Sequence, residues 1–69
     1  SKAAGRSYLE RIAFHEFCGF LSEGYKLMFR YKDSLYSLRH TNGNRIDIKV
    51  NESGLWIMKN GKILKHEMR

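Results

Sequence analysis

The strongest constraint on the fold is a run of short alternating segments in residues 25–66, each ended by a turn signal. The signals are the residue pairs Asp33-Ser34, Asn42-Gly43, Ser53-Gly54 and Asn60-Gly61. Apolar and polar residues that alternate between such signals are typical of β-strands, and the close spacing predicts antiparallel hairpins. Every second side chain of a strand lies on the same face, so the pattern also predicts which residues share a surface.

A helix is predicted before these strands. Ser7 and Glu10 have the spacing of a capping box, and apolar residues recur at helical intervals from Leu9 to Phe20. Because Gly24 is expected to end it, the helix should run from Ser7 to about Glu23. The predicted fold class is α+β: an N-terminal helix packed on a four- to five-stranded antiparallel β-meander, which could curl into a small, partly open barrel. The predicted core contains Leu9, Ile12, Phe17, Phe20, Leu27, Phe29, Leu38, Ile46 and Ile48.

Loop length decides which residues face each other across a hairpin, because a slip of one residue turns a strand over. A two-residue turn at Asp33-Ser34 would pair Tyr31 with Tyr36. A two-residue turn at Asn42-Gly43 would instead place Leu38 opposite Asp47 and separate the apolar faces. We therefore predict an odd loop there, such as Thr41-Asn42-Gly43, which lets Leu38 share a face with Ile46 and Ile48.

The last hairpin carries apolar residues on both faces. A two-residue turn at Asn60-Gly61 would place Ile57 opposite Leu64 and Met58 opposite Ile63. The loop after Val50 can be even or odd, so the sequence does not decide which face joins the core. The surplus face could be covered by barrel closure, by the helix or by a partner.

Composition narrows the class of protein. The 69 residues suit one domain and include 13 Lys and Arg against 7 Asp and Glu, a net charge of +6. Such a charge favours nucleic acid, an acidic protein surface or an anionic membrane surface as partner.

No apolar run approaches the ~20 residues of a membrane-spanning helix. The lone Cys18 fits a reducing compartment, so a cytoplasmic or nuclear location is expected rather than secretion. Residues 1–6 are interpreted as a flexible tail, an expression remnant or the cut edge of a longer protein.

The preferred functional hypothesis is a nucleic-acid-binding module. If Leu55 and Ile57 lie inside, the opposite sheet face would gather six of the 13 Lys and Arg residues together with Trp56. Cations neutralise phosphates, and a flat ring can stack on an unpaired base. Two of the lysines flank the Asn60-Gly61 tip. The candidate contacts are Lys26, Arg30, Lys32, Arg39, Arg45, Lys49, Trp56, Lys59, Lys62 and Lys65.

Two plainer interpretations compete with this one. Lys and Arg on a sheet surface commonly only keep a protein soluble, and a Trp is more often part of a core. Alternatively, the surplus apolar hairpin face could bind an acidic protein partner or a second copy of the chain. That interface would use Leu55, Trp56, Ile57, Met58, Ile63 and Leu64.

No catalytic residue, metal ligand or cofactor is predicted, and the chain is not expected to be an enzyme. His15, His40 and His66 are scattered without the pairing of a zinc site, and Cys18 is expected to pack as a small apolar residue. Residues 25–31 followed by Leu38-Arg39-His40 resemble the basic strands of bacterial RelE/ParE-type toxins. This resemblance implies a metal-independent ribonuclease as a further alternative.

Overall fold

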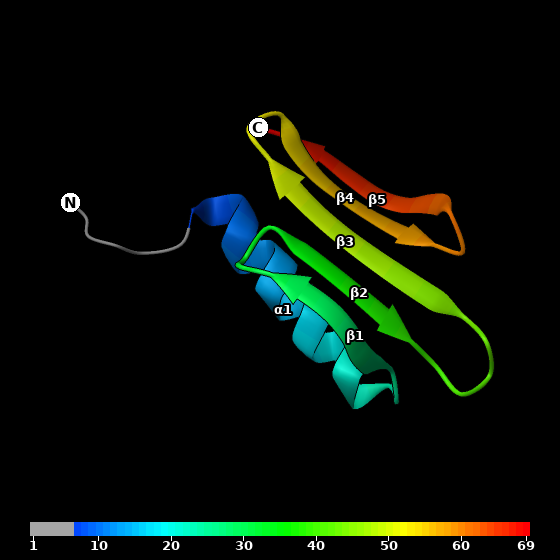
Figure 1. Cartoon of the computed structure of the whole chain (residues 1–69). Helices are drawn as coiled ribbons and strands as arrows, with labels where there is room; N and C mark the ends of the chain where they lie inside the picture. Colours follow the sequence, from blue (N-terminus) through cyan, green and yellow to red (C-terminus); the bar gives the residue numbers. More distant parts are fainter. Residues whose placement is uncertain (1–6) are drawn as a thin grey trace.

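The computed structural model describes residues 7–69 as one helix and a five-stranded antiparallel sheet (Figure 1). The tail predicted for residues 1–6 lies outside the described residues. Each strand pairs with its neighbours along the chain, and the two edge strands do not meet, so the sheet is open. The predicted α+β fold is confirmed, with five strands and no barrel closure. The elements are α1 (Tyr8–Ser22), β1 (Lys26–Tyr31), β2 (Leu35–Arg39), β3 (Arg45–Asn51), β4 (Gly54–Lys59) and β5 (Lys62–Met68).

The ends of α1 form as the sequence predicts. The Ser7 hydroxyl accepts a hydrogen bond from the Glu10 amide at 3.2 Å, and the Glu10 carboxylate accepts one from the Ser7 amide at 2.9 Å. This capping box satisfies two amides that the first helical turn leaves without partners. At the other end, Gly24 has a φ of 100°, and a Cβ there would lie only 2.9 Å from Nε2 of His40. Glycine is therefore required at this position both by conformation and by space.

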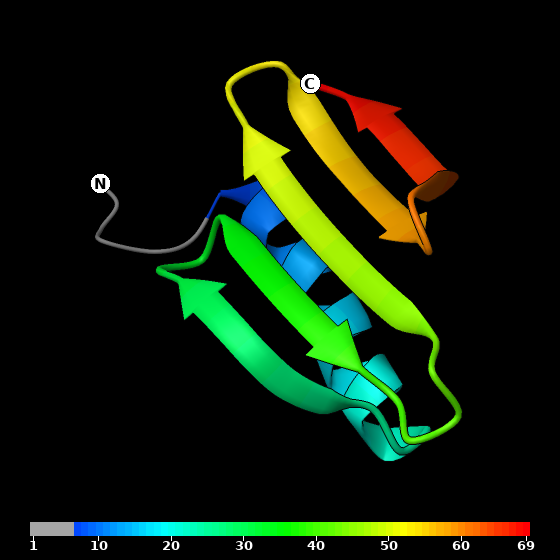
Figure 2. The same ribbon diagram turned by 45° about the vertical axis from the view of Figure 1, so that its right-hand side comes forward.

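The core lies between α1 and one face of the sheet. The helix runs behind β2 and β3, while β5 forms the far edge (Figure 2). Alternate residues of the three central strands point at the helix and are buried, which is the period-two pattern of a half-covered sheet. The buried residues are Leu9, Ala13, Phe17, Tyr25, Tyr36, Leu38, Ile46, Ile48, Val50, Leu55 and Ile57, with Ile12, Phe14 and Phe20 partly buried against them.

The core prediction is wrong at two positions, and the separate expectation that Cys18 packs as a small apolar residue is wrong as well. Leu27 and Phe29 on β1 are 40% and 54% exposed, although both were expected inside. Cys18 is also exposed, because the helix turns it away from the sheet. Tyr25 and Tyr36 occupy the core instead, with Phe17 stacked on Tyr36 at a centroid distance of 4.7 Å.

The odd loop between β2 and β3 is confirmed. Leu38 pairs with Ile46, and the His40 amide donates to the Asn44 carbonyl at 2.9 Å, which leaves residues 41–43 as a three-residue loop. Gly43 takes a φ of 97°, a conformation that glycine adopts without a steric cost. Leu38, Ile46 and Ile48 are all fully buried on the same face.

The two-residue turn predicted at Asp33-Ser34 is wrong. Tyr31 pairs with Leu35, so the turn spans residues 32–34 and Lys32 takes a φ of 52°. Arg30 holds this turn: its Nε donates to the Lys32 carbonyl at 2.9 Å, and its Nη2 lies 2.8 Å from Oδ1 of Asp33. The longer turn reverses the expected faces of this part of β1.

The Asn60-Gly61 turn has the predicted length, and both residues have positive φ, as a type I′ turn requires. Met58 pairs with Ile63 as predicted, whereas Ile57 pairs with Lys65 rather than with Leu64. A bulge between Ile57 and Met58 causes this difference, because one residue of β5 is left without an opposite partner.

Both edge strands carry such an irregularity. The pairing of β1 with β2 shifts between Leu27 and Phe29, and that of β5 with β4 shifts next to Leu64. Bulges disturb the regular edge that another chain would need for strand pairing. Within residues 7–69, no helix is long and apolar enough to cross a membrane.

A matched pair of glycine substitutions tests the packing of β4 against β5. A Cβ at Gly54 would run into the carbonyl oxygen of Glu67, whereas a Cβ at Gly19 meets nothing within 4 Å. We expect Gly54→Ala to lower the free energy of unfolding by about 1–3 kcal/mol through overpacking. Gly19→Ala should raise it by about 0.5–1 kcal/mol through helix propensity. Urea titrations that rank the two variants the other way round would contradict this packing.

Candidate nucleic-acid interface

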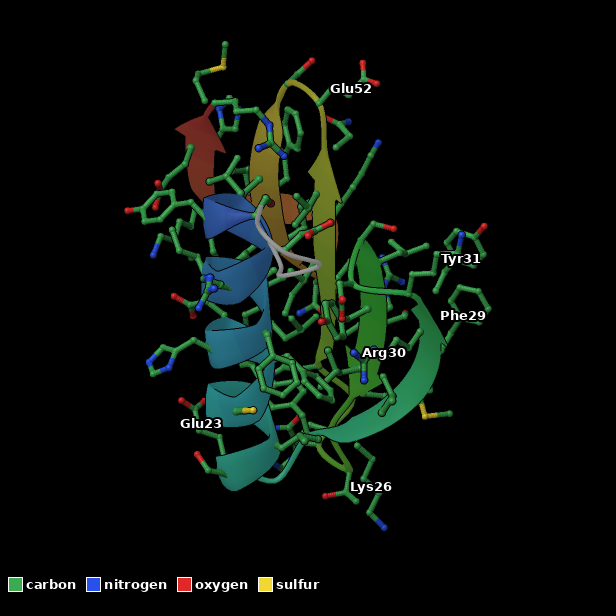
Figure 3. All side chains as sticks on the ribbon, turned by 90° about the vertical axis from the view of Figure 1, so that its left-hand side faces the viewer. Glu23, Lys26, Phe29, Arg30, Tyr31 and Glu52 are labelled. Atoms are coloured by element: carbon green, nitrogen blue, oxygen red, sulfur yellow. The ribbon has the colours of Figure 1, made fainter. Side chains whose placement is uncertain are left out.

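The sheet face turned away from α1, here called the outer face, has no second layer over it among residues 7–69. Leu55 and Ile57 point at the helix, so Trp56 and Met58 lie on the outer face. On β1, Phe29 and Tyr31 point away from the helix, as Figure 3 shows. The outer face is therefore the surface that the chain offers most broadly to a partner.

Cross-strand pairing arranges this face into three rows, each perpendicular to the strands. The cation row contains Lys26, Arg39 and Arg45; the middle row contains Phe29, Ser37, Asp47, Met58 and Ile63; the aromatic row contains Tyr31, Leu35, Lys49, Trp56 and His66. Neighbouring residues within a row are about 5 Å apart, and successive rows lie about 7 Å apart along a strand.

The cation row places three positive side chains directly opposite one another. Lys26 pairs with Arg39, and Arg39 pairs with Arg45. Arg45 has an ion pair with Asp47 at 3.0 Å, while neither Lys26 nor Arg39 has one with any described residue. Like charges at directly opposite positions destabilise a sheet, so this row concentrates charge at a cost to stability.

Hydrogen bonds at the adjoining loop end keep this row in place. Oδ1 of Asn60 accepts from the Arg45 amide at 2.8 Å, and its Nδ2 donates to Oδ1 of Asn44 at 3.1 Å. These two bonds tie the β4–β5 turn to the β2–β3 loop. The cations at this end are consequently carried on a connected backbone rather than on independent loops.

His40 ties the same loop to the end of the helix. The Asn42 amide donates to Nδ1 at 3.1 Å, and Nε2 lies 3.2 Å from the Glu23 carbonyl, which can only accept. The ring also packs edge-on against Tyr25. Both ring nitrogens are thus used in holding the loop, an arrangement that does not favour the proton-transfer role required by the ribonuclease alternative.

The aromatic row has exposed rings at its two ends. Tyr31 is 56% exposed at one edge of the sheet. At the other edge, Trp56 and His66 stack with centroids 4.7 Å apart and an angle of 18° between their planes. The Lys49 ammonium lies 5.9 Å from the Trp56 ring centroid. A cation therefore lies beside a stacked pair of rings at this end of the row.

Asp47 is the one carboxylate in the three rows. Its Oδ1 accepts from the Ser37 hydroxyl at 2.9 Å, and its Oδ2 accepts from Nε of Arg45 at 3.0 Å. Both contacts come from the same face, one from the neighbouring strand and one from two residues earlier on β3. The carboxylate is therefore held in one position at the centre of the outer face.

The prediction that Arg30 and Lys65 lie on the same face as Trp56 is wrong. Arg30 pairs with the buried Tyr36, and its guanidinium lies over the Tyr36 ring at 5.1 Å, on the helix side of β1 (Figure 3). Lys65 pairs with Ile57 and forms an ion pair with Glu16 of α1 at 3.1 Å. The 32–34 turn sets the face of Arg30, and the bulge between Leu27 and Phe29 separates it from the alternation at the start of β1. The bulge in β5 moves Lys65 in the same way.

The remaining predicted cations lie around the rim. Lys32 is in the β1–β2 turn, with its ammonium 5.3 Å from the Tyr31 ring centroid. Lys59 and Lys62 pair with each other beside the β4–β5 turn, in register with helix-facing residues. The structure thus brings together Lys26, Arg39, Arg45, Lys49 and Trp56 on one face, and it does not bring the other candidates onto it.

The residues predicted as a partner surface on the last hairpin also lie on two different faces of the sheet. Leu55 and Ile57 are buried in the core, so they cannot form part of an accessible interface. Trp56, Met58 and Ile63 lie together on the outer face, and Leu64 is exposed at the bulge. The expectation of Trp56 as a core residue is also wrong, since the side chain is only half-buried between Lys49 and His66.

A groove on the helix side offers a less suitable surface for a polyanion. It lies between α1 and β5 and contains charges of both signs. Nζ of Lys65 forms an ion pair there with Glu16 and lies 3.9 Å from Oε2 of Glu67. The lining residues are Tyr8, Arg11, Ile12, His15, Glu16, Lys65 and Glu67. The described part of the chain contains no group of His, Cys, Asp and Glu that could hold a metal ion.

Sequence reasoning missed Phe29, Tyr31, Asp47 and His66 as members of this face. A two-residue turn would place Phe29 and Tyr31 on the core side, whereas the three-residue turn places both on the outer face. Arg30 pairs with Asp33 inside the three-residue turn, a short-range contact that an alternation pattern does not reveal. His66 becomes significant only through its register with Trp56, which the bulge determines.

Comparison with protein-family models gave no match, and comparisons with curated proteins and with solved structures gave none either. The functional argument therefore depends on the residues of this chain alone.

The cation row leads to a stability prediction. Arg39→Gln removes the central charge of the row, so the free energy of unfolding should rise by about 0.2–1 kcal/mol at low salt. The gain should shrink as salt is added, because salt screens repulsion between exposed charges. Chemical denaturation at two salt concentrations measures both effects.

Arg30→Gln is the matched control, since it removes the same charge from the helix side. It loses the Asp33 ion pair and the contact with the Tyr36 ring, so stability should fall by about 0.5–1 kcal/mol. A loss of stability in Arg39→Gln at low salt would show that the row is not repulsive.

Proposed function

We propose that the chain binds single-stranded nucleic acid across the outer face. The observation that carries this proposal is the exposure of aromatic rings, Phe29 and Tyr31, on the same open face as the cation row. Stacking on a ring contributes about 1–3 kcal/mol per base and accepts any base. Cations beside the rings supply the salt-dependent attraction to phosphate.

The layout of the rows suits an unpaired strand. Phosphates that follow the cation row would be close to Lys26 and Arg39, neither of which has an ion pair within the described chain. Bases directed along the strands would then reach the middle row first and the aromatic row next, about 7 Å further on. A duplex keeps its bases paired inside the helix, so the exposed rings would have nothing to stack on.

Charge supports the same choice of partner. The outer face carries Lys26, Arg39, Arg45 and Lys49 against Asp47 alone, in a chain whose net charge is +6. The groove on the helix side, by contrast, has its Lys65 bound to Glu16. A polyanion should therefore be attracted to the outer face. A binding role without catalysis, in the cytoplasm or nucleus, remains our prediction.

A protein partner is the second candidate, favoured by the apolar side chains of the same face. Phe29 and Ile63 are more than half exposed, and Met58 lies between them in the middle row. An acidic protein with an apolar patch, or a second copy of the chain, could cover this surface. Both candidates use the outer face, and they differ in whether nucleic acid binds at all.

Titration of labelled single-stranded RNA and DNA at two salt concentrations tests the proposal. We expect binding that weakens with salt and that exceeds binding to a duplex of the same sequence. For single strands the slope of log affinity against log salt is about 0.7 per phosphate contact, so Arg39→Gln should reduce it by about that amount. Fluorescence anisotropy measures both the affinity and the slope.

Lys65→Gln serves as the matched control, because it removes the same charge from the helix side. Its affinity and salt slope should stay close to those of the parent chain. Absence of binding to any single strand at low salt would overturn the proposal, and a concentration-dependent dimer under those conditions would favour the second candidate.

A further inference from the structure

The Arg45–Asp47 pair has a feature that attraction to phosphate does not use. A carboxylate at the centre of the outer face repels the backbone of a nucleic acid, yet this one is fixed in place by Ser37 and Arg45. Its side chain remains 25% exposed, and that of Arg45 is 46% exposed. Each carboxylate oxygen can accept more than one hydrogen bond, so both retain acceptor capacity toward the solvent.

The pair presents a definite hydrogen-bonding pattern. Arg45 uses Nε for Asp47, and its terminal nitrogens donate to no side chain or carbonyl of residues 7–69. Those nitrogens are donors on the same planar guanidinium, which the bond from Nε holds 3.0 Å from Oδ2 of Asp47. A ligand that approaches the outer face therefore meets the donors of Arg45 next to the acceptors of Asp47, both carried by β3, with Asp47 also held by Ser37 of the neighbouring strand.

Among the common bases, guanine has the complementary edge. Its Watson–Crick edge carries the O6 acceptor next to two donors, N1–H and the exocyclic N2 amine. Uracil and thymine place an acceptor on either side of a single donor, and cytosine and adenine present a ring nitrogen acceptor beside their amine. Only guanine can give the carboxylate two parallel hydrogen bonds while its O6 accepts from the guanidinium.

We propose that the Arg45–Asp47 pair recognises the Watson–Crick edge of an unpaired guanine. This inference rests on the proposed function, because it requires a single strand on the outer face. Sequence-specific recognition of single strands works in this way, through edges that pairing would hide. Ser37 acts as a positioning residue, since its hydroxyl holds Oδ1 of Asp47. Lys26 and Arg39 are left for phosphate.

The experiment uses oligothymidine and oligouridine strands that contain one guanine, compared with strands in which that base is changed. Inosine lacks only the N2 amine, and 7-deazaguanine lacks only N7 on the opposite edge. We expect inosine and adenine to weaken binding about tenfold and 7-deazaguanine to leave it unchanged, as measured by fluorescence anisotropy.

Variants test the residues themselves. Asp47→Asn should bring the guanine-to-inosine affinity ratio close to one, and Ser37→Ala should reduce the ratio in part. Glu52→Gln removes the same charge from the turn between β3 and β4 and should preserve the ratio. The ratio is the readout because loss of a negative charge raises the affinity for every strand.

The possible outcomes separate the two proposals. Equal affinity for all strands would overturn guanine recognition while leaving single-strand binding intact. A loss with 7-deazaguanine but not with inosine would show that the opposite edge is read, which also overturns a role for Asp47. Failure of every strand to bind would contradict the proposed function itself.

Discussion

One helix has to cover a five-stranded sheet, and the rest of the structure depends on this constraint. The helix buries one face of the central strands, where each fully buried side chain such as Ile46 or Ile48 contributes about 1.5–3 kcal/mol. The opposite face receives no cover from residues 7–69, so its side chains have to be compatible with water or with a partner. Core burial is large enough to offset the ~0.2–1 kcal/mol cost of each facing pair in the cation row.

The central strands could be predicted from the sequence because burial leaves them a single register. Leu38, Ile46 and Ile48 can share a buried face only if the β2–β3 loop is odd, and the structure has that loop. The edge strands lack this constraint. β1 is exposed along its whole length, so its register is set by Arg30 and the 32–34 turn, neither of which appears in an alternation pattern.

The residues of the candidate interface could likewise be predicted on the central strands but not on the edge strands. Arg39, Arg45, Lys49 and Trp56 lie on central strands, and their shared outer face follows from the burial of their neighbours. Arg30 and Lys65 lie on edge strands with bulges, so alternation assigned both to the wrong face. The guanidinium of Arg30 now packs on rings of the core, and the ammonium of Lys65 binds Glu16. The 32–34 turn and the bulges of the edge strands thus decide which of these cations lie on the outer face.

The central claim is that a single strand binds on the outer face, and the intrinsic fluorescence of Trp56 tests it most directly. Trp56 is the only tryptophan of the chain, and it lies on that face next to Lys49 and His66. Titration with an unlabelled single strand should change its emission, with the same midpoint that a labelled strand gives by anisotropy. Binding that is seen by anisotropy but leaves the Trp56 emission unchanged would place the strand elsewhere and contradict the account.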